Sequence, residues 1–418
     1  TGNASFGYFG GGSTPSLISS VDRVDYANDT ATASPRGPLS SVLSQLGAVS
    51  SREYNNPFKG PGNLEALVSL APFSRNFGPQ GTDFGYYAGG SPSGPYVTTV
   101  DRVDYSNDTG TAPSKGPLAS ARGYFGATSS ASFGYFAGGA APSLLSTIDR
   151  IDYSNDGVTA VAKGPLSAAK RGIAATGNVS FGYFGGGGPG PAPLSTIDRI
   201  DYTNDTATAT IRGPLSAAKR NLAATGSHNF GYFGGGGPGP KSTVDRVDYS
   251  NDSVTTSPKG PLSFGRDLLA ATGNASFGYF GSGPSPSAAT STVDRVDYSN
   301  DTATALVKGP LNDAKYAIGV TGNTSFGYWG GGVASGPTAK SSVDRVNYSN
   351  DTERATPRGP LSAAKYALVA TSSRANAISL ENIANYAGGI TGTPNTGYFA
   401  GGSPGPGNSS NVQRIDYS

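Results

Sequence analysis

Cysteine and methionine are absent from this sequence of 418 residues, which contains one histidine and one tryptophan. Without cysteine the chain forms no disulfide and offers no thiolate nucleophile or sulfur ligand for a metal. A single histidine, His228, excludes a histidine metal cage, and we expect it to be an ordinary turn residue. The sequence therefore predicts a protein with no cofactor and no metal site.

Charged residues are also scarce, at 14 %, and the formal net charge is only +2. So small a charge does not attract a nucleic-acid backbone, and we expect no nucleic-acid partner. No apolar run reaches about 18 residues, so no membrane span is expected. No signal peptide is visible at the N-terminus, and the missing initiating Met indicates a processed chain or part of a longer one.

Glycine and proline are abundant instead, with 63 and 30 copies. Both residues are poor helix formers, so a helical protein is not expected. Glycine does not recur at every third position, which excludes collagen. The 23 Tyr and 18 Phe are too many for a chain that never folds. The composition therefore favours a folded protein of strands and turns.

Three sequence blocks recur along the chain, with an uninterrupted period of 47 to 50 residues. The block G-Y-F-G-G-G has its tyrosine at Tyr8, Tyr86, Tyr135, Tyr183, Tyr232, Tyr279, Tyr328 and Tyr398. The block V-D-R-V-D-Y-S-N-D has its tyrosine at Tyr26, Tyr105, Tyr153, Tyr202, Tyr249, Tyr298, Tyr348 and Tyr417. The block K/R-G-P-L-S has its glycine at Gly37, Gly116, Gly164, Gly213, Gly260, Gly309 and Gly359. Periods of this length are typical of solenoids and propellers.

Each repeat is predicted to form four short strands, which we name a to d. Examples are Leu222 to Thr225 for strand a, Phe230 to Gly235 for b, Thr243 to Tyr249 for c and Thr206 to Thr210 for d. Four antiparallel strands per period make a propeller blade. Eight copies therefore predict an all-β, eight-bladed propeller that spans residues 1–418 as one domain, with less than about 5 % helix.

The two glycines that end strand b, the tyrosine that closes strand c, the G-P-L and the small-residue strand a resemble kelch repeats over nearly the whole chain. The usual Trp of strand d is missing, since Trp329 lies in strand b, and the Asp that normally follows the tyrosine is Ser, Thr or, once, Ala27. The resemblance implies that the b–c and d–a loops share one face, which commonly binds partners. The sequence motifs D-Y-S-N-D-T-A-T-A and G-P-L-S-A-A-K are also similar to repeats in virion structural proteins of marine tailed phages, cyanophages especially. This resemblance implies that the chain is a component of a virion tail or fibre.

Two insertions interrupt the repeat, and elsewhere its length varies only in the b–c loop. They cover residues 52–82 and 374–394 and are expected to emerge from the a–b turns of blades 2 and 8. The 12-residue spacing of Tyr386 to Tyr398 also allows an earlier placement of the second insertion. Short helices are expected, if anywhere, at Asn63 to Leu70 and Ser379 to Asn385. Non-repeated residues in the insertions are the candidate binding residues, namely Arg52, Glu53, Tyr54, Phe58, Lys59, Arg75, Arg374, Glu381 and Tyr386.

An arginine flanked by Asp recurs in every copy of strand c, and two hypotheses explain it. One is an anion-binding ring, and the other, which we favour, is a ladder of charge-assisted bonds between blades. A residue needed identically in every blade usually serves architecture. These structural repeat positions are Arg23, Arg102, Arg150, Arg199, Arg246, Arg295, Arg345 and Arg414.

Ring closure is the least determined feature. Copy 1 has no strand a of its own and copy 8 has no strand d. The segment around Lys365 to Arg374, another subunit or a longer polypeptide would supply the missing strands. We favour the first for the inner position, because K-Y-A-L-V-A-T-S-S resembles a strand a and Tyr386 to Thr391 resembles a second one. The open outer edge at Val412 to Tyr417 is predicted to contact other structural proteins or copies of the chain.

The sequence predicts no enzyme, because no catalytic constellation stands outside the repeats. We expect a non-enzymatic display or structural module on a virion or another extracellular surface, which binds a glycan or protein through the b–c loops and the insertions. The alternative is an intracellular kelch-type interaction scaffold. A carbohydrate-active enzyme is the least favoured class.

Overall fold

The computed structural model describes residues 6–14, 16–25, 34–36, 47–50, 84–92, 94–285, 288–334, 338–372, 396–400 and 412–416. The chain divides into two compact units. One consists of Thr1–Ser74 with Leu380–Ser418, and the other of Arg75–Ser379. The second unit is therefore inserted, in sequence, within the first.

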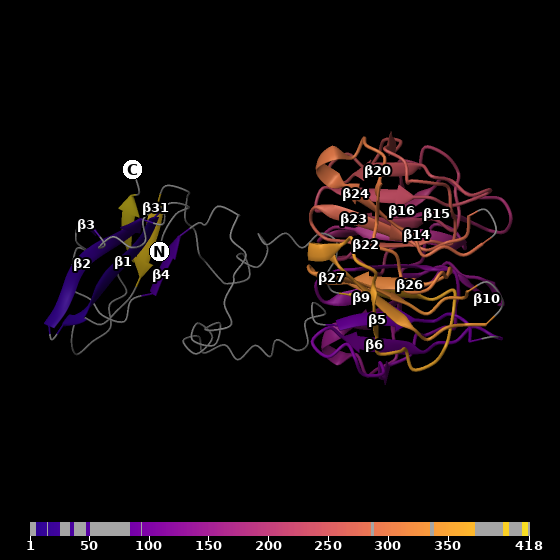
Figure 1. Ribbon diagram of the computed structural model, residues 1–418, viewed down its shortest axis with the longest axis horizontal. Coiled ribbons are helices and arrows are strands. Elements are labelled where there is room, and N and C mark those ends of the chain that lie inside the picture. The colour runs from indigo at the N-terminus through magenta and orange to yellow at the C-terminus, as the bar shows by residue number, and fades with distance from the viewer. Residues whose placement is uncertain are drawn as a thin grey trace. The chain divides into compact units, whose positions relative to one another are not determined.

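The unit Arg75–Ser379 is a propeller of six four-stranded antiparallel sheets (Figure 1). Five blades consist of consecutive strands. These are β8(Gly126–Ser129), β9(Phe133–Ala137), β12(Ile148–Asp152) and β13(Val161–Lys163); β14(Arg171–Gly177), β15(Phe181–Gly188), β16(Ile197–Asp201) and β17(Thr210–Arg212); β18(Ala223–Gly226), β19(Phe230–Gly234), β20(Val244–Asp248) and β21(Ser257–Lys259); β22(Ala270–Gly273), β23(Phe277–Gly281), β24(Val293–Asp297) and β25(Leu306–Lys308); and β26(Gly319–Gly322), β27(Phe326–Gly330), β28(Val343–Asn347) and β29(Thr356–Arg358). A short hairpin, β10(Ala140–Ala141) with β11(Ser143–Leu144), extends one b–c loop.

The sixth blade closes the ring with strands from both ends of the unit. Its outer strands are β5(Phe84–Ala88), β6(Val100–Asp104) and β7(Ser114–Lys115), and its inner strand is β30(Val369–Thr371). Thr371 pairs with Tyr86 in the same register that Thr225 and Tyr232 adopt within one blade. The purple and orange ends of this unit accordingly adjoin in Figure 1. β30, within the segment expected around Lys365 to Arg374, thus supplies a strand a, but to copy 2 of the repeat and not to copy 1.

The unit Thr1–Ser74 with Leu380–Ser418 contains the first and last copies as two three-stranded sheets. β1(Phe6–Thr14), β2(Ser16–Asp25) and β3(Ser34–Arg36) form one sheet. β4(Gly47–Ser50), β31(Thr396–Ala400) and β32(Val412–Asp416) form the other, with β4 paired to β31. Copy 8 therefore receives its strand a from copy 1.

The prediction of eight blades is wrong, since the ring has six. Every strand a pairs with the strand b of another copy, so the number of blades depends on which strand b each strand a joins. β4 pairs with β31 and not with β5, and β30 pairs with β5 and not with β31. Because β4 and β30 exchange partners in this way, copies 2 to 7 close into a ring and copies 1 and 8 do not belong to it. The chain passes between the two units after β4 and again after β30.

The core of the propeller lies between neighbouring blades and not at one centre. One cluster, for example, packs Tyr183 and Ile197 of one blade against Phe233 and Val247 of the next. The rings of Tyr183 and Tyr249 stack across this seam with centroids 4.9 Å apart. The same stack recurs at every seam, including Tyr105 on Tyr328 at the closing one. Each blade thus buries both faces of its sheet, which explains the aromatic content of the repeat.

The glycine of K/R-G-P-L-S lets the backbones of two blades touch. Gly213 donates its N–H to the carbonyl of Asp252 in the next blade, at 2.8 Å. A Cβ at Gly213 would lie 1.8 Å from the carbonyl oxygen of Val254, so no other residue fits without moving the seam. At the closing seam Gly359 makes the same bond to Asp108.

Helix is almost absent from the described part of the chain, which contains only three 3-10 turns. They are η1(Tyr153–Asn155), η2(Tyr298–Asn300) and η3(Tyr348–Asn350). Among the same residues, none of the helical segments has the length and apolar character needed to cross a membrane. The short helices expected at Asn63 to Leu70 and Ser379 to Asn385 lie outside the described residues, as do the insertions predicted at 52–82 and 374–394.

Candidate functional site at the mouth of the central channel

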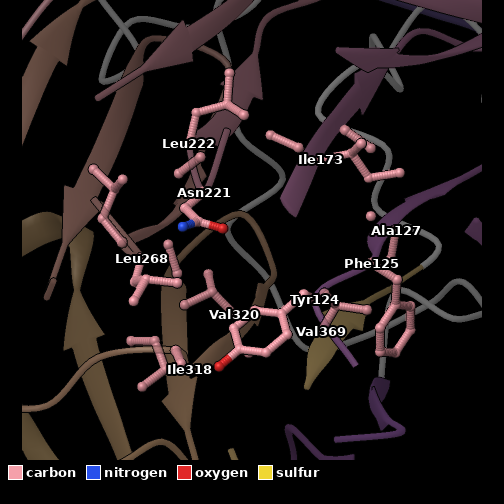
Figure 2. A pocket seen from close by; sticks show the side chains of 18 of the residues that line it. Tyr124, Phe125, Ala127, Ile173, Asn221, Leu222, Leu268, Ile318, Val320 and Val369 are labelled. Atoms are coloured by element: carbon pink, nitrogen blue, oxygen red, sulfur yellow. The ribbon is translucent and has the colours of Figure 1, made fainter. Parts of the chain in front are cut away.

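A channel runs along the axis of the propeller, lined by strand a of all six blades. At the start of these strands it widens to a cavity of about 120 Å³ with a mainly aliphatic lining that includes Leu222, Ile318 and Val320. At their other end a cavity of about 60 Å³ is lined by hydroxyls, among them Thr176 and Thr272. The larger space holds several water molecules or a small apolar group. Figure 2 shows this cavity with Tyr124, Asn221 and Leu268 around it.

Six left-handed residues, one from each blade, surround the mouth of the larger cavity. Their φ angles lie between 49° and 67°. Each donates its backbone N–H to the carbonyl of the equivalent residue in the preceding blade, at 2.7 to 3.0 Å. The six bonds form a closed cycle through Tyr124, Gly172, Asn221, Leu268, Ala317 and Ala367. The mouth is therefore a backbone ring whose N–H groups are all used and whose side chains vary.

Sequence variation concentrates at this ring. Each left-handed residue follows a second variable residue, and the two form a dipeptide that we call the mouth dipeptide. The six mouth dipeptides are Gly123–Tyr124, Arg171–Gly172, Arg220–Asn221, Asp267–Leu268, Tyr316–Ala317 and Tyr366–Ala367. A buried Lys or Arg precedes every one of them, and Phe, Ile or Leu follows. Variation confined between repeated neighbours marks a site that is not needed for the blade itself.

Three consecutive mouth dipeptides bring tyrosines together, and we call this group, Tyr316, Tyr366, Tyr124 and Tyr96, the tyrosine arc. Tyr96 comes from a b–c loop and meets Tyr124 edge to face, with ring centroids 6.4 Å apart. Gly123 makes this possible, because a Cβ there would lie 2.2 Å from the Tyr96 ring. All four tyrosines are half-buried and therefore partly exposed. Burial, followed by the neighbouring phenols Tyr96, Tyr366 and Tyr316, raises the pKa of Tyr124 to about 12, so its hydroxyl stays protonated at neutral pH.

Unpaired positive charge also gathers on this face. Eighteen lysines and arginines of the described propeller form ion pairs. Five others form none with any residue that the structure describes: Arg171, Arg220, Lys241, Lys340 and Arg354. The first four lie in mouth dipeptides or b–c loops, and because strands alternate in direction these share one end of every blade. Only Arg354 lies at the opposite end, after a c–d turn.

The rest of the mouth is more balanced in charge. Asp267 is half-buried beside Asn221 and Arg220. Burial raises the pKa of Asp267, although its own backbone amide, Arg220 and Asn221 oppose the shift. Arg220 donates to the carbonyl of Gly190 at 2.8 Å. Asp313 is the other acidic residue of the d–a segments, and the described b–c loops contain none. None of the three mouth dipeptides of the tyrosine arc, which ends at Arg171, contains a carboxylate, although Asp313 precedes Tyr316 by three residues in the same d–a segment.

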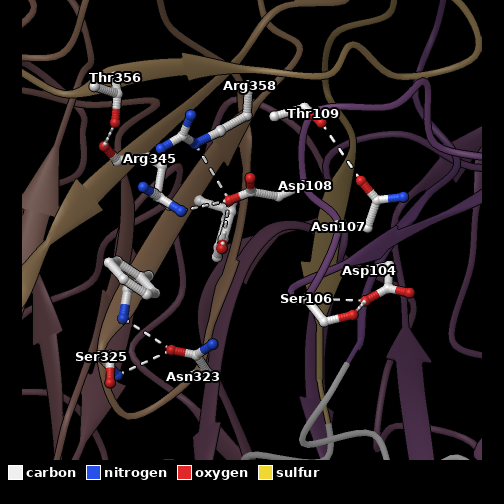
Figure 3. A network of polar contacts seen from close by, with 12 residues as sticks. Asp104, Ser106, Asn107, Asp108, Thr109, Asn323, Ser325, Arg345, Thr356 and Arg358 are labelled. Carbon is white, nitrogen blue, oxygen red and sulfur yellow. Dashed lines mark hydrogen bonds and ion pairs between the residues drawn. The ribbon is translucent and has the colours of Figure 1, made fainter.

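The repeated arginines lie away from the mouth, at the seams. Arg199 contacts Asp252 of the next blade at 2.8 Å, and Tyr183 donates its hydroxyl to the same oxygen. Six of the eight arginines make this contact, in the pairs Arg102–Asp156, Arg150–Asp205, Arg199–Asp252, Arg246–Asp301, Arg295–Asp351 and Arg345–Asp108. Figure 3 shows the last pair, which closes the ring, with Arg358 as a second cation on Asp108. Arg23 lies in β2 opposite Tyr8, and Arg414 lies in β32 opposite Tyr398.

The other predicted site residues fall outside the described part of the chain. These are Arg52, Glu53, Tyr54, Phe58, Lys59, Arg75, Arg374, Glu381 and Tyr386. His228 lies in the a–b turn between β18 and β19. Across the residues that are described, no three His, Asp or Glu side chains are grouped to hold a metal ion. The mouth dipeptides were not among the predicted sites, although their variation was visible in the sequence.

Comparison with known proteins gives no family assignment. No protein-family model matches the chain, and a search of curated protein sequences finds no match either. The fold is therefore assigned from the structure alone, as an all-β propeller with six blades.

Proposed function

We propose that the chain is a non-enzymatic interaction module of a larger structure, a virion appendage or another extracellular surface, and that it binds a glycan or a protein through the mouth of the propeller. The face formed by the mouth dipeptides and the b–c loops is the binding surface. The two sheets outside the ring serve attachment, with the outer edge of β32 as a contact for other structural proteins or further copies of the chain. The kelch and phage resemblances of the repeats agree with this role.

The observation that supports the proposal is the difference between the side chains at the seams and those at the mouth. At the seams, the repeated Arg, Asp and Tyr side chains bind one another across two blades. At the mouth, side chains differ from blade to blade, and several cations have no partner among the described residues. Exposed residues that are not needed for the fold are the usual carriers of recognition.

A binding screen on the full chain tests the proposal. The labelled chain is applied to a glycan array and to immobilised extracts of cell-surface proteins, beside a variant in which Arg171, Tyr316 and Tyr366 are all changed to Ala. We expect at least one immobilised glycan or protein to retain the native chain and to lose the variant by more than tenfold. The Arg354→Ala variant is the matched control, because it removes an unpaired cation from the opposite end of the propeller.

Equal retention of the native chain and the triple variant on every surface would remove the mouth as the binding surface. Turnover of a saccharide by the native chain would contradict the non-enzymatic part of the proposal.

A further inference from the structure

We infer that the tyrosine arc, together with Arg171, binds an acidic saccharide, a sugar that bears a carboxylate. This inference rests on the proposed function, since it names the ligand class of the same mouth. Three observations support it: the group of partly exposed tyrosines, the unpaired guanidinium beside it, and the scarcity of free backbone donors.

The aromatic surface suits a sugar ring. The tyrosines come from three consecutive mouth dipeptides and one adjoining b–c loop, and each is partly exposed. Tyrosine presents an apolar ring face and a hydroxyl that both donates and accepts. A pyranose has the matching pair of surfaces, an apolar face of C–H groups and an edge of hydroxyls. The arc follows the rim of the ring, because Tyr124 bonds to Ala367 and Ala367 bonds to Ala317 through the backbone.

Arg171 gives the surface its charge preference. It is exposed, immediately follows the tyrosine arc around the ring, and forms no ion pair with any described residue. In a propeller that pairs eighteen other cations, an unpaired guanidinium at this position is a deviation from the rule. Arginine binds a carboxylate with two parallel hydrogen bonds, so a carboxylated sugar satisfies it. No mouth dipeptide of the arc carries an acidic residue that would compete for Arg171.

The backbone of the mouth disfavours a peptide. An extended peptide gains affinity by pairing its main chain with free N–H and C=O groups of a receptor strand. All six N–H groups of the left-handed ring are donated to the neighbouring blade. In five of the six mouth dipeptides the first residue is likewise paired with the b–c loop, as Tyr366 is with Ser91 and Tyr316 with Val333. A ligand must therefore bind through side chains. A saccharide can do so without penalty, because it has no peptide backbone whose N–H and C=O groups would be left unpaired.

Calorimetric titration of the full chain with defined saccharides tests the inference. The probes are a hexamer of galacturonic acid, the same hexamer with every carboxylate methyl-esterified, and an oligomer of sialic acid. We expect at least one acidic oligomer to bind, and the ester to bind at least tenfold more weakly than its acid. Affinity for the acid should fall with rising salt, because the Arg171 contact is exposed.

Two substitutions assign the contacts. Arg171→Ala should weaken the acidic oligomer more than tenfold and leave the ester unchanged. Tyr366→Ala should weaken both forms, and Tyr366→Phe should keep most of the affinity if ring stacking dominates. The Arg354→Ala control should bind like the native chain, and thermal melting establishes that each variant is folded.

Three results would overturn the inference: binding of neither acidic oligomer, binding that Arg171→Ala does not change, or equal binding of a hexaglutamate peptide with the same dependence on Arg171. If the mouth instead retains a neutral glycan or a protein, the proposed function stands and only the ligand class is wrong.

Discussion

At all six seams between blades the same side chains recur, whereas at the channel mouth neither position of the mouth dipeptide is constant. Seam side chains are bound to one another in groups that join two blades. Mouth side chains project from a ring of backbone hydrogen bonds that forms without their participation. Repetition here marks the residues that hold the ring together, and its interruption marks the residues that we propose bind a ligand. The seams should therefore respond to substitution through stability, and the mouth through binding.

The largest effect is expected at the seam carboxylates. Asp252→Ala removes at once the partner of Arg199, Arg212 and Tyr183. Because it leaves two cations facing each other at a mostly buried seam, it should lower the free energy of unfolding by about 3–5 kcal/mol. Thermal and denaturant unfolding of the full chain measure this. Arg199→Ala should cost less, about 1–2 kcal/mol, because Arg212 remains on Asp252. Equal costs for the two variants would show that the second cation does not support the first.

A second kind of ion pair lies inside each blade, and its loss should rank next. Lys219 and Asp245 are 0 % exposed and 3.0 Å apart, and Ser216 donates to the same carboxylate. Burial lowers the pKa of Lys219, although Asp245 opposes the shift. Lys219→Met should cost about 3 kcal/mol, because it leaves a carboxylate buried without its cation.

The double variant Lys219→Met with Asp245→Leu separates burial from attraction. It removes both charges, so most of the stability lost in the single variant should return. A double variant that is no more stable than Lys219→Met would show that the pair contributes a specific geometry that apolar packing does not replace. Urea unfolding of the two variants side by side measures the difference.

The sequence predicts the blade well because each strand is specified locally. The Tyr of strand b, the Arg of strand c and the Gly of G-P-L occupy in every blade the places that alternation and turn chemistry imply. The number of blades is not local. It depends on whether β4 or β30 pairs with β5, and the two candidate strands, G-A-V-S and V-A-T, have nearly the same composition. The number of repeat copies therefore predicts eight blades, whereas the pairing of β4 with β31 and of β30 with β5 produces six.

The mouth was missed for a different reason. Length variation in the repeat lies in the b–c loops, whereas the mouth dipeptide varies in identity at constant length. Its signal was a two-residue interruption between a repeated Lys or Arg and a repeated Leu, Ile or Phe, as in Lys219 to Leu222. That these dipeptides meet around one axis follows only from ring closure, which the sequence did not determine.

A smaller effect of opposite sign is expected at the mouth. Ala317 adopts a φ of 53°, a conformation that costs an L-residue about 1–2 kcal/mol and costs glycine little. Glycine loses more freedom on folding, so Ala317→Gly should raise the free energy of unfolding by a net of about 0.5–1 kcal/mol. Gly172 occupies the equivalent position in another blade and shows that the ring accepts it. A destabilised variant, measured by thermal melting, would mean that the Ala317 methyl group contributes to the apolar lining more than the strain costs.

The smallest effect concerns the c–d turns, at the end of the propeller opposite the mouth. Asp248 accepts hydrogen bonds from the backbone N–H of Ser250 at 2.9 Å and from its hydroxyl at 2.6 Å. In the last blade Asn347 makes both bonds to Ser349 with an amide oxygen. Asp248→Asn should therefore change the free energy of unfolding at pH 7 by less than about 0.5 kcal/mol.

Low pH distinguishes the Asp248 carboxylate from the amide of the Asp248→Asn variant. The hydroxyl of Ser250 is the main cause that lowers the pKa of Asp248 from 3.8, with help from its N–H, although slight burial opposes the shift. Because the folded-state pKa is the lower one, the carboxylate stabilises the turn above pH 3.8 and this contribution is lost as the pH falls through the folded-state value. An amide does not titrate, so melting temperatures measured from pH 6 to pH 2 should fall slightly less for Asp248→Asn than for the native chain. A variant already destabilised at pH 7 by more than about 1 kcal/mol would show that the turn needs the negative charge itself, and that Asn347 is tolerated only in its own blade.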